Sequence, residues 1–429
     1  MDKHHWNVLV FPGGMENGLE IYRSLKGCKE VTLFSASSNV ANQAFYVYKN
    51  NHICSDVRSD YWVEELNNIV RECDIDIIYP ANSLVIDALH SHKGEIVCPV
   101  LLPSDHVLEI TRSKRKTIEQ LHEVIPCPRL YAAKDEIRKL PVFAKPDNGY
   151  GAQGARVISN KEELQQIDFN SYVVQELLPG KEYTIDCFSD SNGKLLFASG
   201  RERTRVRMAT SMHAEPLPDA LETYFYECAE KILKRIRMTG AWFFQMKEKA
   251  DATLALLEID VRIAGTMCYN RCKGVNFPLL SLYTYYGLPV SVSTNKINIS
   301  LDRCLKNSYI IDYDYDTVYV DLDDTLVLRD KVNTQLISFL FQCLNNNKEI
   351  ILLSKHLGDG NAYLNKYHIK DIFSSIVWMD ESDDKYKYMK NDRAIYIDDS
   401  FSQRKEVADK LKIPTFDASM IECLIDERI

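Results

Sequence analysis

The chain has 429 residues, and at roughly 100–200 residues per domain this length predicts two to four domains. Hydrophobic residues make up 45% and charged residues 26% of the chain, which excludes disordered, collagen-like and low-complexity classes. The 52 basic and 61 acidic residues leave a net charge of −9 without a long basic run, so we expect no nucleic-acid partner.

No apolar run approaches the ~18 residues that span a bilayer, and the first residues do not resemble a secretory leader. We therefore expect a cytoplasmic protein without a membrane partner. The 12 cysteines are scattered without a CxxC pair, which is typical of reduced thiols rather than of a disulfide framework or a zinc site.

The first hundred residues alternate between strand and helix patterns. Apolar runs predict strands at Asn7–Pro12, Val31–Ala36, Asp74–Pro80 and Val97–Leu102, and helical spacing predicts helices at Leu19–Leu25 and Ser83–His92. Strands separated by helices indicate βαβ units and a parallel sheet. We expect a domain of this α/β class over residues 1–112.

The pattern then changes to one helix followed by consecutive strands, which is typical of an α+β domain. The helix is expected at Ser113–Val124 and the strands at Val142–Lys145, Ala155–Ile158, Tyr172–Glu176 and Tyr183–Ser189. An acidic run that includes Asp312, Asp314 and Asp316 reads as a solvated connection, and strand and helix alternate again after it. We therefore place the further domains at residues 113–308 and 309–429.

A lysine and a glycine-rich loop form the first candidate site. Lys145 ends an apolar strand, and Gly149, Gly151 and Gly154 follow it. Glycines let backbone N–H groups approach phosphate oxygens, and the lysine supplies a positive charge. Such a loop by itself is more often an ordinary turn, and the GxxxxGK[ST] spacing of a P-loop is absent.

Alternating carboxylates form a second part of this site. On a strand, Glu258, Asp260 and Arg262 would share one face, and Gln245 on the preceding strand could add an oxygen ligand. Converging carboxylates favour a bound cation, and Mg²⁺ that bridges phosphates would supply it. The alternative interpretation is the polar face of a half-buried strand.

Together these segments resemble the ATP-grasp superfamily, in particular its carbamoyl-phosphate-synthase-like carboxylate–amine ligases, over about residues 5–290. The motifs are Lys145 with the glycine loop, the segment from Val174 to Glu182, and the segment from Glu258 to Arg262. The resemblance implies a Rossmann-like preATP-grasp domain followed by an ATP-grasp fold.

The resemblance also implies roles for single residues. Lys114 and Lys145 would contact ATP phosphates, Glu176 to Leu178 would bind adenine, Glu182 would bind ribose, Gln245, Glu258 and Asp260 would hold Mg²⁺, and Arg262 would meet the transferred phosphate. Two positions depart from the family pattern. Asp260 stands where the family usually has Asn, and Ser113 stands where it usually has Asp before the first lysine.

Four arginines follow at alternate positions, Arg201, Arg203, Arg205 and Arg207. On an extended segment they would share one face and could clamp an acceptor's carboxylate or phosphate. The alternative interpretation is a solvated strand edge.

A second constellation lies in the last third of the chain. The apolar strand Thr317–Val320 leads into Asp321, Asp323 and Thr325, spaced as DxDxT. Ser354 ends a later apolar strand, Lys385 lies in a charged segment, and Asp398 and Asp399 end another strand. Acids at the carboxyl ends of parallel strands meet in one crevice.

This order of motifs resembles the haloacid dehalogenase (HAD) superfamily and implies a small HAD-like Rossmannoid domain. By this resemblance Asp321 is the nucleophile, Asp323 is the general acid/base, and Ser354 and Lys385 neutralise phosphoryl oxygens. Asp321, Asp323 and Asp398 or Asp399 would form a metal site. Lys355 and Lys387 compete with Lys385 for the lysine position. The 33 residues between Asp321 and Ser354 hold one expected helix and leave no room for a cap domain.

We therefore predict a bifunctional enzyme of α/β and α+β domains: an ADP-forming ATP-grasp ligase that joins a carboxylate to an amine, fused to a phosphomonoesterase. Its expected cofactors are ATP and Mg²⁺, with Mn²⁺ as a substitute, and its partners are a small carboxylate, an amine and a phosphorylated metabolite. The prediction is compatible with a homodimer. Two alternatives remain: a kinase-type phosphotransferase, and a nucleotide-binding sensory or assembly protein with one silent half.

Overall fold

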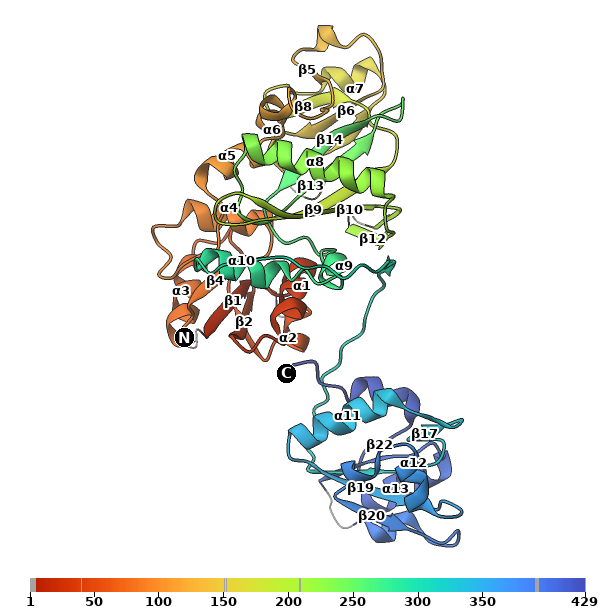
Figure 1. Cartoon of the computed structure of the whole chain (residues 1–429). Helices are drawn as coiled ribbons and strands as arrows, with labels where there is room; N and C mark the ends of the chain where they lie inside the picture. Colours follow the sequence, from red (N-terminus) through yellow and green to blue (C-terminus); the bar gives the residue numbers. More distant parts are fainter. Residues whose placement is uncertain are drawn as a thin grey trace. The chain divides into compact units, whose positions relative to one another are not determined.

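The computed structural model describes residues 5–39, 41–149, 151, 153–207, 210–389 and 393–428. The chain divides into two compact units, Met1–Leu305 and Lys306–Ile429 (Figure 1). In the described part of the chain, no helix has the length and apolar character that crossing a membrane requires.

A parallel sheet in the order β3-β2-β1-β4 opens the first unit. Its strands are β1 (Trp6–Phe11), β2 (Val31–Ser37), β3 (Asn50–Ile53) and β4 (Ile77–Pro80), and its helices are α1 (Glu16–Leu25), α2 (Ala44–Val47), α3 (Trp62–Glu72) and α4 (Ser83–Ser91). β1 is buried on both faces: Val8 and Val10 share a core with α1, whereas Leu9 and Phe11 share one with α3. Burial on both sides explains its continuous apolar run.

Two details of this sheet differ from the sequence prediction. The expected strand Val97–Leu102 is wrong, because the structure has only one bridge there, between Ile78 and Val100. Pro99 has no N–H to donate to a ladder, which explains the interruption. The structure adds β3, whose residues Asn50-Asn-His-Ile carry no strand-like apolar pattern because they form the edge of the sheet.

Three further sheets complete the first unit. Two are four-stranded and antiparallel, in the orders β5-β8-β6-β7 and β10-β9-β13-β14, and a small one has the order β11-β12-β15. The strands are β5 (Leu130–Tyr131), β6 (Val142–Pro146), β7 (Arg156–Ile158), β8 (Tyr172–Glu176), β9 (Glu182–Ser189), β10 (Leu195–Glu202), β11 (Arg205–Arg207), β12 (Thr210–Ala214), β13 (Gly240–Glu248), β14 (Leu254–Asp260) and β15 (Leu301–Asp302).

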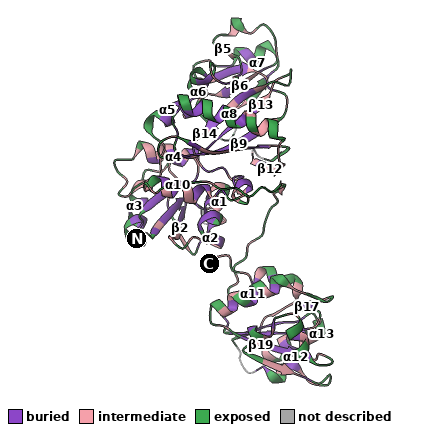
Figure 2. Cartoon of the chain, viewed as in Figure 1, coloured by how far each residue is buried: buried purple, intermediate pink, exposed green. Residues whose placement is uncertain are grey.

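The helices of this part are α5 (Asp105–Arg112), α6 (Lys114–Leu121), α7 (Lys161–Gln165), α8 (Asp219–Arg235), α9 (Cys268–Arg271) and α10 (Phe277–Tyr285), with a 3₁₀ turn η1 (Lys134–Glu136). One face of the sheet β10-β9-β13-β14 is apolar and shares a core with α8, through residues such as Ile185, Phe244 and Phe225. The opposite face carries polar side chains, which include Thr184, Asp186 and Gln245. Figure 2 shows the buried strands in purple and the exposed outer side of α8 in green.

The second unit is built on a parallel sheet in the order β20-β19-β16-β21-β22, with a hairpin of β17 and β18 beside it. Its strands are β16 (Thr317–Val320), β17 (Val327–Leu328), β18 (Lys331–Val332), β19 (Glu349–Ser354), β20 (Ser375–Trp378), β21 (Ala394–Ile397) and β22 (Thr415–Phe416). Its helices are α11 (Thr334–Asn345), α12 (Gly360–Lys366) and α13 (Phe401–Leu411), with 3₁₀ turns η2 (Lys370–Ile372), η3 (Lys385–Tyr388) and η4 (Ala418–Cys423). The central strand β16 is completely buried, so the polar residues that follow it emerge from a rigid base.

Candidate active sites

Lys145 lies at the end of β6 and is 6% exposed. Its ammonium donates a 2.9 Å hydrogen bond to the carbonyl oxygen of Leu257 on β14, beside Glu258. Burial lowers the pKa of Lys145 to about 8, and the nearby Glu258 carboxylate opposes part of that shift. A positive charge held in a dry position binds phosphate more strongly than one in water.

The glycine loop follows Lys145 directly. Gly151 and Gly154 have φ angles of +60° and +73°, in the left-handed region that favours glycine. A Cβ on Gly154 would lie 3.0 Å from the ring of Pro146, so the position also requires a small residue. Tyr150 and Ala152 of the same loop lie outside the described residues.

A cavity joins this loop to the far strand of the neighbouring sheet. It is lined by Lys114, Gly149 and Gly151 on one side and by Glu258, Asp260 and Arg262 on β14 and just after it. The Lys114 ammonium donates to the carbonyl oxygens of Asp147 and Gly149, both at 3.1 Å. Burial lowers the pKa of Lys114. The structure therefore brings together one predicted lysine, two loop glycines and all three residues of the acidic motif.

Serine at position 113 has a clear structural role. Ser113 caps α6 by accepting a hydrogen bond from the Lys116 N–H at 3.1 Å, and its hydroxyl donates to Asp147 at 2.8 Å. Serine and aspartate are both good N-caps, so the departure at Ser113 preserves the helix start that presents Lys114. Asp147 supplies a negative charge close by.

Asp260 is enclosed by cations. Its carboxylate accepts from Arg112 at 2.9 Å and from Arg262 at 2.7 Å, and Ser83 donates to it at 2.8 Å. Although burial acts in the opposite direction, the charges of Arg262 and Arg112 lower the pKa of Asp260 to about 2. Arg262 lies beyond the end of β14, so the expectation that it continues the strand is wrong, yet it still reaches Asp260.

Glu258 and Gln245 face each other across β14 and β13, as partners in the antiparallel register. With its amide nitrogen turned toward Glu258, Gln245 donates to that carboxylate at 3.1 Å and accepts from Thr184 at 3.2 Å. In this orientation the Gln245 oxygen faces Thr184, and the Glu258 carboxylate lies near the Lys145 ammonium. Metal binding by Gln245 and Glu258 stays a prediction. Asp260 is already held by two arginines.

The residues expected around adenine and ribose lie at the connection between β8 and β9. Glu176 accepts from the Arg129 N–H at 2.8 Å and forms an ion pair of 2.9 Å with Lys249, and Leu178 is buried. Glu182 forms ion pairs with Arg203 and, at 3.3 Å, with Lys247. Their contact with nucleotide stays a prediction.

The four arginines do not form one exposed face. Arg201 on β10 is completely buried, pairs with the buried Asp186 and donates to Thr266 at 2.5 Å. Arg203 pairs with Glu182, and Arg205 forms an exposed ion pair with Asp302 at 2.8 Å. The clamp interpretation is wrong for the set, because the chain leaves β10 after Glu202 and resumes as β11.

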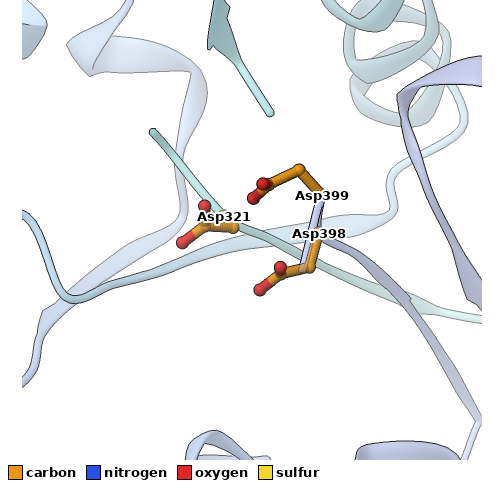
Figure 3. Close-up of side chains that lie close together, drawn as sticks. All are labelled: Asp321, Asp398 and Asp399. Carbon is orange, nitrogen blue, oxygen red and sulfur yellow. The ribbon is translucent and has the colours of Figure 1, made fainter. Parts of the chain in front are cut away.

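In the second unit, three carboxylates converge at the ends of two adjacent parallel strands. Asp321 follows β16, and Asp398 and Asp399 follow β21 (Figure 3). One oxygen of each lies within 4.8 Å of the others. Burial raises the pKa of Asp321. The Lys385 ammonium lowers this pKa, and the Asp398 carboxylate raises it further. Oxygen ligands of this kind suit Mg²⁺.

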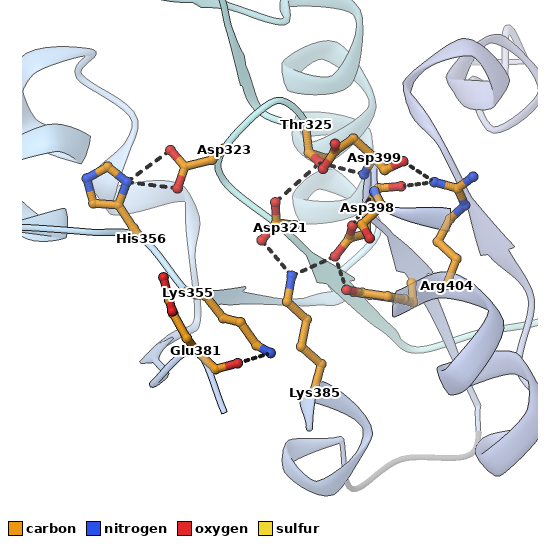
Figure 4. A network of polar contacts seen from close by, with 12 residues as sticks. Asp321, Asp323, Thr325, Lys355, His356, Glu381, Lys385, Asp398, Asp399 and Arg404 are labelled. Carbon is orange, nitrogen blue, oxygen red and sulfur yellow. Dashed lines mark hydrogen bonds and ion pairs between the residues drawn. The ribbon is translucent and has the colours of Figure 1, made fainter. Parts of the chain in front are cut away.

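Lys385 is the lysine that reaches this site (Figure 4). Its ammonium lies 2.6 Å from Asp321 and 2.6 Å from Asp398, and the residue is 4% exposed. Lys387 instead pairs with Asp384 on the surface, and Lys355 donates to the Glu381 carbonyl oxygen. The short turn η3 therefore brings Lys385 to the carboxylates, and a functional role for this lysine stays a prediction.

Hydroxyl groups and an arginine complete the site. Ser354 ends β19 and is buried, and its hydroxyl finds no hydrogen-bond partner among the described residues. Thr325 accepts from the Asp399 N–H at 2.9 Å. Arg404, which the sequence analysis missed, donates to the carbonyl oxygens of Asp398 and Asp399 at 2.6 Å and fixes their loop.

Asp323 is directed away from Asp321 (Figure 4). Its two carboxylate oxygens each lie 2.9 Å from Nδ1 of His356. The carboxylate cluster formed by Asp321, Asp398 and Asp399 does not include the Asp323 side chain. The sequence analysis missed His356, although its position two residues after Ser354 was a usable signal.

Comparison with known proteins finds a family match within the first unit and a curated relative of the chain. Residues 168–302 match the family described as "ATP-grasp in the biosynthetic pathway with Ter operon". A 3-methyl-D-ornithine–L-lysine ligase of Methanosarcina mazei is 29% identical over 195 residues, which cover 44% of this chain and 49% of the relative. The chain thus spans about half the length of that curated relative.

Solved structures show the same fold. The β,γ-ATP complex of Campylobacter jejuni biotin carboxylase has a TM-score of 0.57 and 16% identity, over 68% of this chain and 74% of that one. The biotin carboxylase domain dimer of Hydrogenobacter thermophilus 2-oxoglutarate carboxylase, with MgADP, has a TM-score of 0.56 and 16% identity, over 67% and 72%. The chain therefore contains an ATP-grasp fold.

Proposed function

We propose that the ATP-grasp part of this chain is an ADP-forming ligase that joins a carboxylate to an amine. One observation carries the proposal: a single cavity holds Lys114, the glycine loop, Glu258 and Arg262, with Lys145 beside it. Cations on one side and carboxylates on the other are what a nucleotide triphosphate and its metal ion require.

The chemistry follows from the weakness of a carboxylate as an electrophile. A substrate carboxylate oxygen attacks the γ-phosphorus of ATP, the bond to the β,γ-bridging oxygen breaks, and ADP leaves. The amine then attacks the acyl phosphate, phosphate departs, and the amine loses a proton. Lys145 and Lys114 would hold the phosphates, and Arg262 would face the transferred group. Gln245 and Glu258 would hold Mg²⁺, which would offset the phosphate charge.

Amino acids are the substrate class that we propose. The relatives bear the name 3-methyl-D-ornithine–L-lysine ligase, and both compounds in that name are amino acids. Arg112 and Arg262 lie at the cavity and could orient a carboxylate. A homodimer, cytoplasmic location and Mn²⁺ as a substitute metal remain expectations of this proposal.

ADP release from a panel of amino acids tests the ligase. The wild-type protein should form ADP with a carboxylate substrate, and added hydroxylamine should trap the acyl phosphate as a hydroxamate. Glu258→Gln should raise the Mg²⁺ concentration needed for half-maximal turnover by about tenfold or more, because one metal charge is lost. A stable phosphorylated product without hydroxamate would favour the kinase-type alternative, and no turnover with any acceptor would favour the sensory alternative.

For residues 309–429 we propose a capless HAD-like, metal-dependent phosphomonoesterase. The convergence of Asp321, Asp398 and Asp399 around Lys385 carries this proposal. Asp321 would attack phosphorus, while Lys385 and Ser354 would neutralise the phosphoryl oxygens. The three carboxylates would hold Mg²⁺, which would supply further positive charge. Release of phosphate from phosphomonoesters, lost on chelation of metal and restored by Mg²⁺, tests it.

A further inference from the structure

The pair formed by Asp323 and His356 stands apart from the carboxylate cluster of the second unit. Nδ1 of His356 lies 2.9 Å from both Asp323 oxygens. The Asp323 side chain is 46% exposed, whereas that of His356 is 12% exposed. When Nδ1 carries a proton it donates to one Asp323 oxygen, and the other oxygen stays available for a proton of its own. A half-exposed acid is thus held by a donor that is itself buried.

The surroundings of His356 fix its ring. The ring centroid lies 4.5 Å from that of Tyr363 and 6.2 Å from that of Trp378. Gly360 packs so closely on Trp378 that a Cβ there would lie 2.3 Å from the indole ring. The loop after β19 therefore has little freedom to turn the imidazole away from Asp323.

The direction of Asp323 agrees with an in-line reaction. In such a displacement the leaving oxygen lies on the far side of phosphorus from the nucleophile. A proton donor for that oxygen must stand away from Asp321, and Figure 4 shows the Asp323 carboxylate pointing away from Asp321 and toward His356.

We propose that His356 is a positioning residue that holds Asp323 on the leaving-group side, and that this matches the site to phosphomonoesters of alkyl alcohols. The inference rests on the proposed phosphatase function and deepens it. An alkoxide is a poor leaving group and requires a proton donor, whereas a nitrophenolate departs as a stable anion. A site that holds its proton donor in a fixed position is suited to alkyl phosphomonoesters.

Two steps release first the alcohol and then the phosphate. An Asp321 oxygen bonds to phosphorus, the ester bond from phosphorus to the alkyl oxygen breaks, and protonated Asp323 gives its proton to that oxygen. Water then attacks the aspartyl phosphate and gives a proton to Asp323, and the bond from phosphorus to Asp321 breaks. The products are an alcohol and inorganic phosphate. His356 touches neither the substrate nor the reacting atoms, and acts through Asp323.

Three substitutions of His356 distinguish loss of its hydrogen-bond donor from loss of its ring packing. His356→Phe keeps a ring between Tyr363 and Trp378 but removes the donor. His356→Asn places an amide nitrogen near the position of Nδ1, whereas His356→Gln places it near Nε2. His368→Asn is the matched control, because His368 is exposed in the same unit and its φ of +56° suits asparagine.

The full-length protein is assayed for kcat/KM with p-nitrophenyl phosphate and with an alkyl phosphate, since kcat/KM reports the steps up to loss of the leaving group. In His356→Phe and His356→Gln we expect kcat/KM for the alkyl phosphate to fall about 10- to 100-fold, which is part of the 10²–10⁴ that acid–base catalysis contributes. For p-nitrophenyl phosphate we expect kcat/KM to fall by less than about threefold. His356→Asn should recover most of the alkyl activity, and His368→Asn should match wild type.

Equal losses with both substrates in folded His356→Phe and His356→Gln variants would overturn the positioning role and indicate a merely structural histidine. Unchanged alkyl activity in either variant would overturn it as well. If His356→Phe unfolds, the contrast between His356→Asn and His356→Gln decides, because the two amides differ only in where the donor lies. Wild-type protein that hydrolyses neither ester would overturn the phosphatase proposal itself.

Discussion

The ammonium of Lys145 donates across 2.9 Å to the carbonyl oxygen of Leu257, which joins two separate sheets of the first unit. Lys145 belongs to β6, at the glycine loop, and Leu257 belongs to β14, which carries the acidic motif. This hydrogen bond therefore connects the strand that carries the proposed phosphate contact to the strand that carries the acidic motif. The low pKa of this lysine, about 8, comes from its burial.

Lys145→Met should lower kcat/KM for ATP by about 100-fold or more, the loss typical of one electrostatic donor in a dry site. The wild-type value should also fall as the pH rises through about 8, because only the ammonium attracts phosphate. The variant should lack this dependence. ADP formation between pH 6.5 and pH 9.5 measures both, with the exposed Lys139→Met as control. A variant with wild-type ADP formation would remove Lys145 from the site.

The sequence analysis predicted the separate segments of the Lys145 site, but not the contacts that hold these segments together. Lys145, the glycines and the acidic strand each follow from nearby residues: an apolar strand, a turn, and alternating polarity. The approach of Arg112 to Asp260 depends on how α5 packs beside β14, which no local pattern encodes. The single arginine face also failed for a tertiary reason, because burial of Arg201 against Asp186 outweighs local alternation.

Asp260→Asn tests the arginine pair. The folded pKa of Asp260, about 2, lies below its ordinary value, so its ionisation stabilises the fold above about pH 4, and this stabilisation is lost as the pH falls toward 2. The shift corresponds to roughly 2 kcal/mol. We expect the variant to unfold more easily than wild type at pH 7 by about that free energy, and the difference to shrink in acid.

Urea unfolding followed by tryptophan fluorescence measures this difference, because Trp6, Trp62 and Trp242 report on the first unit. Exposed Asp135→Asn serves as the control. A difference that stays constant from pH 7 down to pH 3 would show that the charge of Asp260 is not what stabilises the fold. Because related ATP-grasp motifs usually carry asparagine here, ADP formation should persist.

Lys385→Met should abolish phosphate release, because its ammonium bridges Asp321 and Asp398, both at 2.6 Å. Lys387→Met, two residues away in the same η3 turn, should retain nearly all of the activity, since Lys387 is exposed and its partner Asp384 lies outside the carboxylate cluster. Phosphatase assays at saturating Mg²⁺ compare the two. Comparable activity of both variants would exclude Lys385 from a catalytic role.

Asp321→Asn should remove phosphomonoester hydrolysis, since an amide does not attack phosphorus and also takes a charge from the proposed metal site. ADP-forming activity should remain, because the carboxylates around Asp321 all belong to the second unit. Parallel measurement of phosphate release from an ester and of ADP checks both halves. Loss of ATP-dependent ligation in a folded variant would mean that the two reactions share an obligatory intermediate.

In the second unit, most candidate site residues could be predicted from the order of the motifs along the chain. Asp321, Ser354 and Asp398 each end an apolar strand, and adjacent parallel strands bring such ends together. The lysine could not be chosen from sequence, because Lys385 and Lys387 differ only in the direction that a short 3₁₀ turn gives them. The position of His356 two residues after Ser354 placed it near the site, but its contact with Asp323 could not be predicted because it depends on the path of a loop.

The small strand β15, residues Leu301 and Asp302, determines where this chain can be divided. It pairs with β12, and Asp302 meets Arg205 at 2.8 Å, while the next residue, Arg303, reaches Glu16 at 2.9 Å. A fragment that stops at residue 300 would bare the edge of β12, and an unpaired edge invites association between molecules. A fragment of residues 1–308 keeps those contacts and should elute from size-exclusion chromatography as a single species without aggregates. The shorter fragment should aggregate. The last residues before the second unit thus belong, in practice, to the first.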